Sequence, residues 1–283
     1  MIVPGSPSQA FAAALADATG DPLATATYDR FPDGEGLAAV PGFEGDRATV
    51  VCATVSDAAH VELLQLQDAV REAGATDVTT VLPYMGYARQ DAAFEPGHPV
   101  SARAVARAVS TGTDRVVLVT PHERSVAEFF GVPCTVVDAA PRLADPLPAD
   151  LDDPLFLAPD AGATALAASV RDAYGRGATD HFEKTRHSGT EVTVEPSDAA
   201  VDGRDVVVVD DIVATGSTMS EAVAALADGG AARVFVTCVH PVFARNARTK
   251  LADAGVAAVH ATDTVERPWS TVSAAPVVAD ALE

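Results

Sequence analysis

The stretch VVVVDDIVATGSTM, residues 206–219, decides how the chain folds. Its four valines form a short, continuous apolar run, which is typical of a strand buried on both faces of a parallel sheet. Asp210 and Asp211 follow at the carboxyl end of this predicted strand, and a turn at Gly216 then opens a helical segment. In open parallel sheets, ligands bind beyond the carboxyl ends of the strands. The turn is therefore the first candidate for a binding site.

The turn from Ala214 to Thr218 has the groups that bind a phosphate monoester. Consecutive backbone N–H groups lie at the positive end of the following helix, and Thr215, Ser217 and Thr218 add three hydroxyls. Gly216 lets the backbone approach the phosphate closely. These groups suffice for a phosphate without any lysine. Asp210 and Asp211 would repel a phosphate, but they suit the cis-diol of a ribose, whose hydroxyls donate to carboxylates. Together they describe ribose 5-phosphate.

Two other interpretations use the same acids. In the first, the acids only cap the junction between strand and helix. In the second, they belong to a magnesium-binding Walker B strand, which requires a GxxxxGK[ST] loop elsewhere. Lys184 and Thr185 resemble the end of such a loop, but Glu183 stands where glycine is required. The second interpretation is therefore excluded.

Short apolar runs alternate with alanine-rich segments along all 283 residues. The predicted strands cover residues 48–55, 77–82, 115–120, 134–137, 155–158, 206–209, 233–240 and 256–261. The predicted helices cover residues 58–73, 101–110, 124–130, 161–173, 217–228 and 246–254. This alternation predicts an α/β fold in which mostly parallel sheets are flanked by helices.

Prolines between positions 141 and 154 interrupt this pattern. We expect an N-terminal domain over residues 1–143 and a C-terminal domain over residues 144–283, whose last residues can pack on the first domain. The segments 83–100 and 187–204 read as loops long enough to indicate function.

The composition excludes several classes of protein. The net charge is −21, and Lys184 and Lys250 are the only lysines. Such an acidic surface repels nucleic acid and anionic membranes but favours solubility at high salt, so we interpret the chain as a cytoplasmic protein of a halophile. Cys52, Cys134 and Cys238 lie in apolar runs and predict neither a disulfide framework nor a zinc site. No run approaches the ~18 apolar residues of a membrane span, and the N-terminus does not read as a signal peptide.

Residues 206–219 resemble the phosphoribosyl diphosphate-binding motif of type I phosphoribosyltransferases and ribose-phosphate diphosphokinases. Four further segments are similar to the diphosphokinases in particular: RFPDGE (30–35), PYMGYARQDAAFEPGHPVSARAVA (83–106), PDAGA (159–163) and EKTRHSGTEV (183–192). The C-terminal TDTVERPWSTVSAAPVVADAL (262–282) fits an archaeal, haloarchaeal type of member. The resemblance implies two type I phosphoribosyltransferase-like domains. It also implies transfer of the diphosphoryl group of ATP to the 1-hydroxyl of ribose 5-phosphate.

The resemblance assigns roles to charged residues that have plainer explanations on their own. Lys184 and Arg186 would be the catalytic pair of a mobile loop, rather than two solvated surface charges. His122, which follows an apolar strand, would bind Mg²⁺ together with Asp160. On its own it would read as a residue that caps the strand end or packs in the core. The diphosphate loop would consist of Asp160, Ala161, Gly162 and Ala163.

ATP binding is assigned by the same resemblance. Two sets of residues are implied: Arg89, Gln90 and Asp91 from the long loop, and Phe31, Asp33 and Glu35 from a partner subunit. The active enzyme is therefore expected to be at least a dimer with a shared active site. Without the resemblance, Arg89 would read as a solvated loop charge.

The chain also departs from the family pattern. Ala92, Ala93 and Glu95 stand where basic residues are frequent, Thr120-Pro121 precedes His122 where an acid or asparagine and an aliphatic residue are common, and Ala214 stands where many relatives have aspartate. The reduced basic arms remove the support for control by ADP.

Three alternatives remain at this point. A phosphoribosyltransferase would need one such domain and a base-binding hood. A non-catalytic regulatory paralogue of the synthase should have lost catalytic or metal-binding residues, which are present here. A regulator that binds DNA is disfavoured by the acidic charge.

Overall fold

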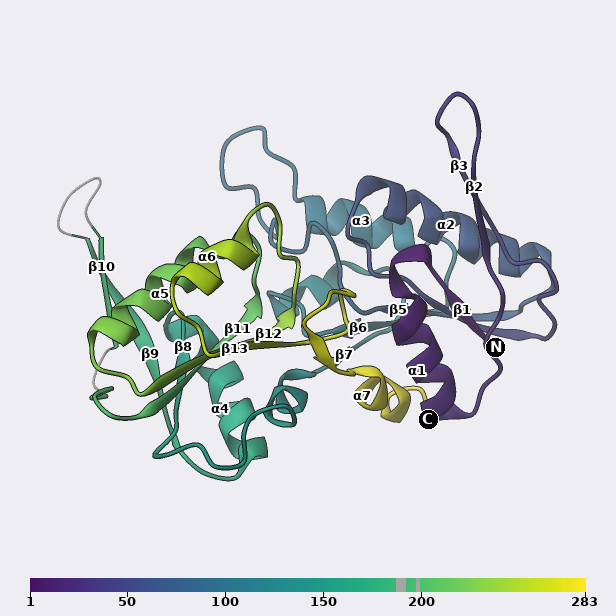
Figure 1. Cartoon of the computed structure of the whole chain (residues 1–283). Coiled ribbons are helices and arrows are strands. Elements are labelled where there is room, and N and C mark those ends of the chain that lie inside the picture. The colour runs from purple at the N-terminus through teal and green to yellow at the C-terminus, as the bar shows by residue number, and fades with distance from the viewer. Residues whose placement is uncertain (187–191, 197–198) are drawn as a thin grey trace. The chain divides into compact units, whose positions relative to one another are not determined.

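The computed structural model describes residues 1–186, 192–196 and 199–283, and for residues 184–186 and 192–196 it describes the backbone alone. The chain forms two compact units (Figure 1). Unit 1 contains residues 1–138, 264–266 and 273–283, and unit 2 contains residues 139–263 and 267–272. Within the described part of the chain, no helix is long and apolar enough to cross a membrane.

Unit 1 is built on a five-stranded parallel sheet with the order β1-β4-β5-β6-β7. Its strands are β1 (Ile2–Pro4), β4 (Arg47–Val51), β5 (Asp77–Leu82), β6 (Arg115–Val119) and β7 (Cys134–Val137). The helices are α1 (Gln9–Thr19), α2 (Asp57–Glu72), α3 (Ser101–Val109) and α7 (Ala275–Asp280), with the short 3-10 helices η1 (Ser6–Ser8) and η2 (Arg124–Phe129).

Helix α2 shows why these segments fold as they do. Ser56 caps its first turn by accepting a hydrogen bond of 3.2 Å from the Ala59 amide. Leu63, Leu66 and Val70 recur at helical spacing and are fully buried, so one stripe of the helix covers the sheet core.

The end of the chain returns to unit 1. Helix α7 packs against α1, at the beginning of the chain. Just before it, Glu266 accepts hydrogen bonds from the amides of Ala10 and Phe11, at 2.7 and 3.1 Å. These amides lie in the first turn of α1, where helical N–H groups lack partners within the helix. A residue from the end of the sequence therefore completes the first helix.

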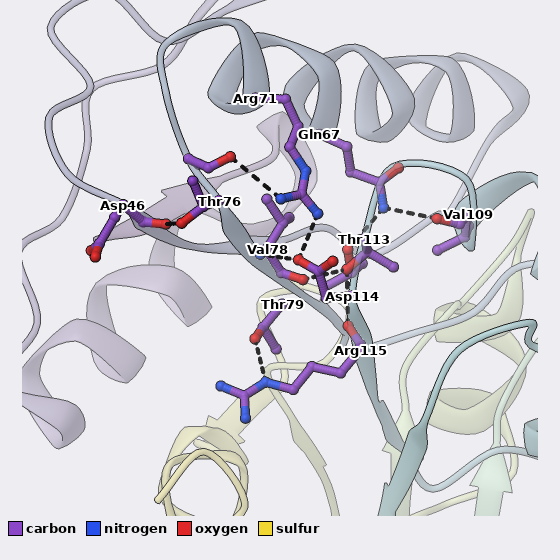
Figure 2. Close-up of polar contacts among 12 residues, drawn as sticks. Asp46, Gln67, Arg71, Thr76, Val78, Thr79, Val109, Thr113, Asp114 and Arg115 are labelled. Carbon is purple, nitrogen blue, oxygen red and sulfur yellow. Dashed lines mark hydrogen bonds and ion pairs between the residues drawn. The ribbon is translucent and has the colours of Figure 1, made fainter.

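A polar network lies at the amino ends of β5 and β6, away from the carboxyl ends (Figure 2). Asp114 accepts a hydrogen bond of 2.7 Å from the Val78 amide and pairs with Arg71 of α2 at 2.5 Å. Thr113 donates its hydroxyl to the Val78 carbonyl at 2.8 Å. Burial alone would raise the pKa of Asp114, but the Val78 amide and the Arg71 guanidinium lower it. This network joins a helix to the beginnings of two strands.

Unit 2 contains a seven-stranded sheet with the order β10-β9-β8-β11-β12-β13-β14. Its strands are β8 (Leu155–Ala158), β9 (Ala178–Arg186), β10 (Val192–Pro196), β11 (Asp205–Ile212), β12 (Arg233–His240), β13 (Ala258–Thr262) and β14 (Ser270–Val272). All neighbours pair in parallel except β9 and β10. The helices are α4 (Thr164–Tyr174), α5 (Ser217–Asp228) and α6 (Ala247–Asp253), with the 3-10 helices η3 (Ala140–Ala144) and η4 (Ala161–Ala163).

The strand β11 lies in the middle of this sheet, between β8 and β12. Its valines, Val206 to Val209, have no exposed surface, as expected for a strand covered on both faces. At its amino end, Asp205 is 2% exposed and accepts two hydrogen bonds from Arg233 of β12. The buried carboxylate is thereby compensated.

The expected α/β architecture, with mostly parallel sheets flanked by helices, is confirmed. Several details were wrong. The strand predicted over residues 206–209 runs from Asp205 to Ile212, so both aspartates belong to its last residues. The predicted helix 124–130 is the 3-10 helix η2, and the strand predicted over residues 48–55 ends at Val51. The segment 187–204, read as a loop, contains β10.

Candidate functional site

The carboxyl ends of β8 and β11 bring acidic residues of unit 2 together. The two strands pair in parallel, with Val208 opposite Leu157, so both end at the same edge of the sheet. Asp210 and Asp211 are carried by β11, and Asp160 follows β8. Asp160 and Asp211 both act electrostatically on Asp210. The structure therefore brings Asp160 close to two acids that lie 50 and 51 residues later in the sequence.

The geometry of β11 fixes the directions of its two acids. Asp210 accepts a hydrogen bond of 2.9 Å from the Asp211 amide, and Asp211 accepts one of 2.8 Å from the Ile212 amide. Burial raises the pKa of Asp210 well above its ordinary value, and the negative charges of Asp211 and Asp160 add to the rise. Neutral or positive partners, such as sugar hydroxyls or a metal ion, would relieve this repulsion.

Asp160 occupies the turn predicted to hold diphosphate. Its Oδ1 accepts hydrogen bonds from the amides of Gly162 and Ala163, at 3.0 and 3.3 Å, and so caps η4. A side chain at Gly162 would come within 3.2 Å of this oxygen, so glycine keeps the turn open. Ala161 completes the loop. An exposed carboxylate on a turn rich in amides suits a magnesium–diphosphate complex.

A dedicated cage for a metal is not found among the described residues, where no three His, Cys, Asp or Glu side chains gather as ligands. Mg²⁺ commonly binds proteins through one or two carboxylates and takes its other ligands from water and substrate phosphates. The crowded carboxylates at the end of β11 and after β8 fit that mode of binding.

The turn after β11 is held tightly by the segment that leads into α6. Gly216 has a φ of 70°, and a Cβ there would lie 3.1 Å from Cα and Cβ of Ala247. The Phe243 amide donates to the Val213 carbonyl at 2.9 Å, and the Ala244 amide to the Ala214 carbonyl at 2.8 Å. Gly216 is therefore required both for its backbone conformation and for the close approach of α6.

The hydroxyls of the turn lie where the sequence predicted them, at the amino end of α5. Thr215 and Thr218 are exposed, and Ser217 is partly buried. The hydroxyl oxygens of Thr215 and Ser217 are 3.5 Å apart. Together with the first amides of α5, which have no partners within the helix, they form a site suited to an anion.

Sequence reasoning missed Lys250 as part of this turn. Its ammonium group donates a hydrogen bond of 2.5 Å to the Ser217 hydroxyl from α6, 33 residues further along the chain. The sequence predicted a turn that binds phosphate without any lysine, and the structure adds a lysine in contact with one of its hydroxyls. No local pattern in the sequence pointed to this contact, since Lys250 lies in a separate helix.

In unit 1, the predicted ATP-side residues lie on the loop between β5 and α3. Arg89 is exposed and Asp91 is partly buried. The side-chain amide of Gln90 holds the loop closed: it donates to the Pro99 carbonyl and accepts from the Ser101 hydroxyl, both at 3.2 Å. The loop thus presents Arg89 outward from a base that Gln90 fixes to the start of α3.

The residues predicted to reach a partner subunit lie at the tip of a hairpin. The antiparallel strands β2 (Thr27–Arg30) and β3 (Gly36–Ala39) form it. Asp33 accepts a hydrogen bond of 3.1 Å from the Glu35 amide, and the Phe31 amide donates to the Glu35 carbonyl at 2.8 Å. The side chain of Phe31 is 49% exposed. A hydrogen-bonded turn therefore presents an aromatic ring to solvent.

His122 lies in unit 1, exposed, in the bend after β6. The residue directly after this strand, Thr120, has a φ of 36°, which is strained for a β-branched side chain. Its amide donates to the Val137 carbonyl at 2.8 Å, which helps to hold this conformation. Strained backbone at the carboxyl end of a strand is common at functional sites.

Lys184 and Arg186 belong to the end of β9, and their backbones pair with Val194 and Val192 of β10. Their side chains, and residues 187–191 of the predicted catalytic loop, lie outside the described part of the structure. The assignment of this catalytic pair stays a prediction.

Two family models match the chain. The N-terminal domain of ribose phosphate pyrophosphokinase matches residues 1–112, and the phosphoribosyl transferase domain matches residues 145–274. The sequence is 66% identical over 283 residues to ribose-phosphate pyrophosphokinase from Halobacterium salinarum, with 100% of both chains covered. It is 42% identical over 284 residues to the protein of that name from Methanosarcina acetivorans, covering 100% of this chain and 99% of the relative.

A solved structure of similar architecture supports the same grouping. Phosphoribosylpyrophosphate synthetase from Mycobacterium smegmatis superimposes with a TM-score of 0.84 at 27% identity, covering 100% of this chain and 97% of that one.

Proposed function

The chain belongs to the ribose-phosphate pyrophosphokinase family, and from this premise we propose how its residues carry out the reaction. The enzyme forms 5-phosphoribosyl 1-diphosphate and AMP from ribose 5-phosphate and ATP. Its two units are phosphoribosyltransferase-type domains with mostly parallel sheets. One observation supports the assignment of the sugar site. At the end of the buried strand β11, the carboxylates of Asp210 and Asp211 lie directly before a turn rich in hydroxyls.

Ribose 5-phosphate binds with its phosphate on the turn of residues 214–218. The amides at the start of α5 and the hydroxyls of Thr215, Ser217 and Thr218 donate to the phosphate oxygens. Asp210 and Asp211 accept hydrogen bonds from the 2- and 3-hydroxyls of the sugar, which relieves the repulsion between the two carboxylates. This arrangement fixes the sugar at both ends and directs its 1-hydroxyl toward the diphosphate loop.

The chemical step is an in-line displacement at the β-phosphorus of ATP. The 1-hydroxyl oxygen of ribose 5-phosphate forms a bond to this phosphorus, and the bond between it and the α,β-bridging oxygen breaks, so AMP leaves and the hydroxyl proton is released. Negative charge spreads over the phosphate oxygens in the transition state. Lys184 supplies a point charge and Arg186 a bidentate fork for this charge, so the two side chains have separate roles.

Mg²⁺ bound to ATP would neutralise charge on the phosphates. Asp160 and His122 would hold this ion, with the diphosphate on the amides of residues 161–163. The fit of Asp160 rests on its exposed position on the turn and on the crowded carboxylates beside it.

ATP and a second subunit are bound through unit 1. Arg89 and Asp91 contact the nucleotide, and Gln90 supports their loop. Phe31, with Asp33 and Glu35, reaches the adenine of a neighbouring subunit. In support, the most exposed large hydrophobic side chains of the described residues, Leu23, Phe31, Leu37, Val55, Val61, Tyr87 and Phe94, all belong to unit 1. Of these, Leu37 and Val61 line the same cavity beside the hairpin, as an interface on this unit would require.

The enzyme works in the cytoplasm at high salt. The net charge of −21 supports this proposal, because screening removes the self-repulsion of such a surface.

Phosphorus NMR tests the proposed reaction directly. Incubation of the protein with ATP, MgCl₂ and ribose 5-phosphate should produce AMP and a diphosphate ester of the sugar, without free phosphate. Formation of these products only when an active synthase is added would indicate a regulatory paralogue. Consumption of added phosphoribosyl diphosphate with a nucleobase, without AMP formation from ATP, would indicate a phosphoribosyltransferase.

A further inference from the structure

The hydrogen bond between Lys250 and Ser217 joins one of two lysines of the chain to the proposed phosphate site. Lys250 is partly buried on α6, and its Nζ lies 2.5 Å from the Ser217 hydroxyl oxygen. The sequence has 40 acidic residues and 19 basic ones, of which 17 are arginines. The turn is therefore contacted by one of only two lysines in a chain whose other basic residues are arginines.

The packing of α6 holds Lys250 in place. Ala247, one turn earlier on the helix, is fully buried against Gly216, and Leu251, the next residue, is 2% exposed. The Ala244 amide ties the start of this segment to the Ala214 carbonyl. The helix thus approaches the turn closely on a buried face, so the lysine is directed to Ser217 by the backbone around it.

The contact decides what the Ser217 hydroxyl can do. A serine hydroxyl donates one hydrogen bond and accepts two. Because the ammonium group has only donors, Ser217 must be the acceptor in this pair, and its own hydrogen points elsewhere. A phosphate oxygen on the turn, or Thr215 at 3.5 Å, can receive it.

The charge of Lys250 has a second effect. The end of β11 and the turn after β8 carry Asp160, Asp210 and Asp211, and the sugar phosphate adds further negative charge. The helix dipole offsets only about half an elementary charge. The ammonium group adds a full positive charge on the turn itself.

We infer that Lys250 is a positioning residue for the 5-phosphate of the sugar substrate. It orients the Ser217 hydroxyl as a donor to the phosphate and adds a positive charge beside the turn. The inference rests on the proposed function, since it assigns the phosphate to this turn. It makes the site selective for a sugar that carries a charged phosphate group.

The test compares Lys250→Met, Lys250→Arg and Arg248→Met. Methionine keeps an apolar stem of similar length without the charge, so packing of α6 is preserved. Arg248 is the matched control, because it is on the same helix and carries the same charge, but its guanidinium lies over the Trp269 ring, 5.0 Å from the centroid. For each variant, kcat and the KM values for ribose 5-phosphate and ATP are measured, and sugar binding is titrated by phosphorus NMR.

Lys250→Met should raise the KM and the Kd for ribose 5-phosphate by about tenfold, the effect of one lost charge-assisted hydrogen bond. Its kcat and its KM for ATP should stay within about twofold, and Lys250→Arg should recover most of the affinity. An unchanged KM for the sugar in Lys250→Met would overturn the inference, and so would an equal rise in Arg248→Met.

Ser217→Ala provides a second measurement that does not depend on the fold of one variant. If Lys250 acts through the Ser217 hydroxyl, Lys250→Met should raise the KM for ribose 5-phosphate less in the Ser217→Ala background than in the wild-type protein. Full additivity would contradict the proposed orientation of the hydroxyl. Failure of the proposed function has a different signature, because the unmodified protein would then form no AMP.

Discussion

Arg233 donates two hydrogen bonds to Asp205, one of 2.8 Å from Nε and one of 2.6 Å from Nη2, where β12 and β11 begin side by side. Asp205 also accepts a hydrogen bond of 2.6 Å from the Asp152 amide. At the other end of the same strand, Asp210 and Asp211 repel each other. The strand is thus anchored by an ion pair at its amino end and carries two mutually repelling acids at its carboxyl end.

The anchor should contribute measurably to stability. Asp205→Asn should lower the free energy of unfolding by about 2 to 3 kcal/mol, because it leaves Arg233 and the Asp152 amide with a poorer partner, although Arg233 is partly solvated. Urea unfolding measures the difference. Asp172→Asn is the control: Asp172 pairs with Arg171 at 2.7 Å but is 69% exposed, so its loss should cost less than about 0.5 kcal/mol. Equal effects would contradict this account.

The same anchor should be sensitive to acid. The hydrogen bonds from Arg233 and the Asp152 amide lower the pKa of Asp205 in the folded protein, although burial acts against them. Its stabilising effect is therefore complete above the ordinary aspartate pKa of about 3.9 and is lost as the pH falls through the lowered value. The difference in stability between wild type and Asp205→Asn should shrink below about pH 4. A difference that stays constant down to pH 2 would show that the carboxylate charge is not its cause.

Asp210 should behave in the opposite way. Burial and the neighbouring acids raise its pKa, so its ionised form destabilises the folded protein at neutral pH. Asp210→Asn keeps the acceptor for the Asp211 amide and should raise stability by about 1 kcal/mol in the absence of ligands, while weakening sugar binding. Thermal unfolding with and without ribose 5-phosphate measures both effects. Glu221→Gln, an exposed charge on α5, is the control, and a decrease in the stability of Asp210→Asn would refute the prediction.

Gly216 should be intolerant of any side chain. Gly216→Ala introduces a Cβ 3.1 Å from Ala247 and places alanine at a φ of 70°. We expect the KM for ribose 5-phosphate to rise by about tenfold or more, since small displacements of the phosphate site weaken several hydrogen bonds at once. Gly203→Ala is the control that tests backbone strain without a close contact. Gly203 has a φ of 74°, but no atom lies within 4 Å of the position of an added Cβ. That variant should lose about 1 kcal/mol of stability and keep its KM.

Lys184 should act mainly in the transition state. Lys184→Ala is expected to lower kcat by about a hundredfold or more and to change the KM for ATP far less, because charge develops on the phosphate oxygens only during transfer. Steady-state and single-turnover kinetics separate the two effects. An unchanged kcat in Lys184→Ala would contradict a catalytic role for this lysine.

The sequence predicted best the elements that are marked by a short run of consecutive apolar residues. The valines of β11 form a continuous apolar run, and the turn after them carries its hydroxyls and glycine in consecutive positions. The edge strand β10 and its neighbour β9 were missed because their sequences, VTVEP and ATDHFEKTR, mix charged and apolar residues without a clear period. The hairpin of β2 and β3 was missed for a similar reason, since most of its residues are exposed.

The contacts that link distant positions could not be predicted from local patterns. Lys250 reaches Ser217 only because α6 packs on the turn, and no spacing in the sequence encodes that contact. The pair of Asp205 and Arg233 depends on which strands are neighbours in the sheet. Resemblance to the family supplied roles for residues such as Asp160, but not the amides of Gly162 and Ala163 that orient its carboxylate.

The hydrogen bonds from the amides of Ala10 and Phe11 to Glu266 span 256 and 255 positions of the chain. A protein is synthesised from its amino end. Almost the entire polypeptide must therefore be made before helix α1 can hydrogen-bond to Glu266 and pack against α7. Residues 139–263, which form most of unit 2, are synthesised before Glu266 and α7, so the first unit still lacks these contacts while most of the second is being made. The part that leaves the ribosome first is thus among the last to be completed, and its unfinished surface is open to proteases and aggregation until then.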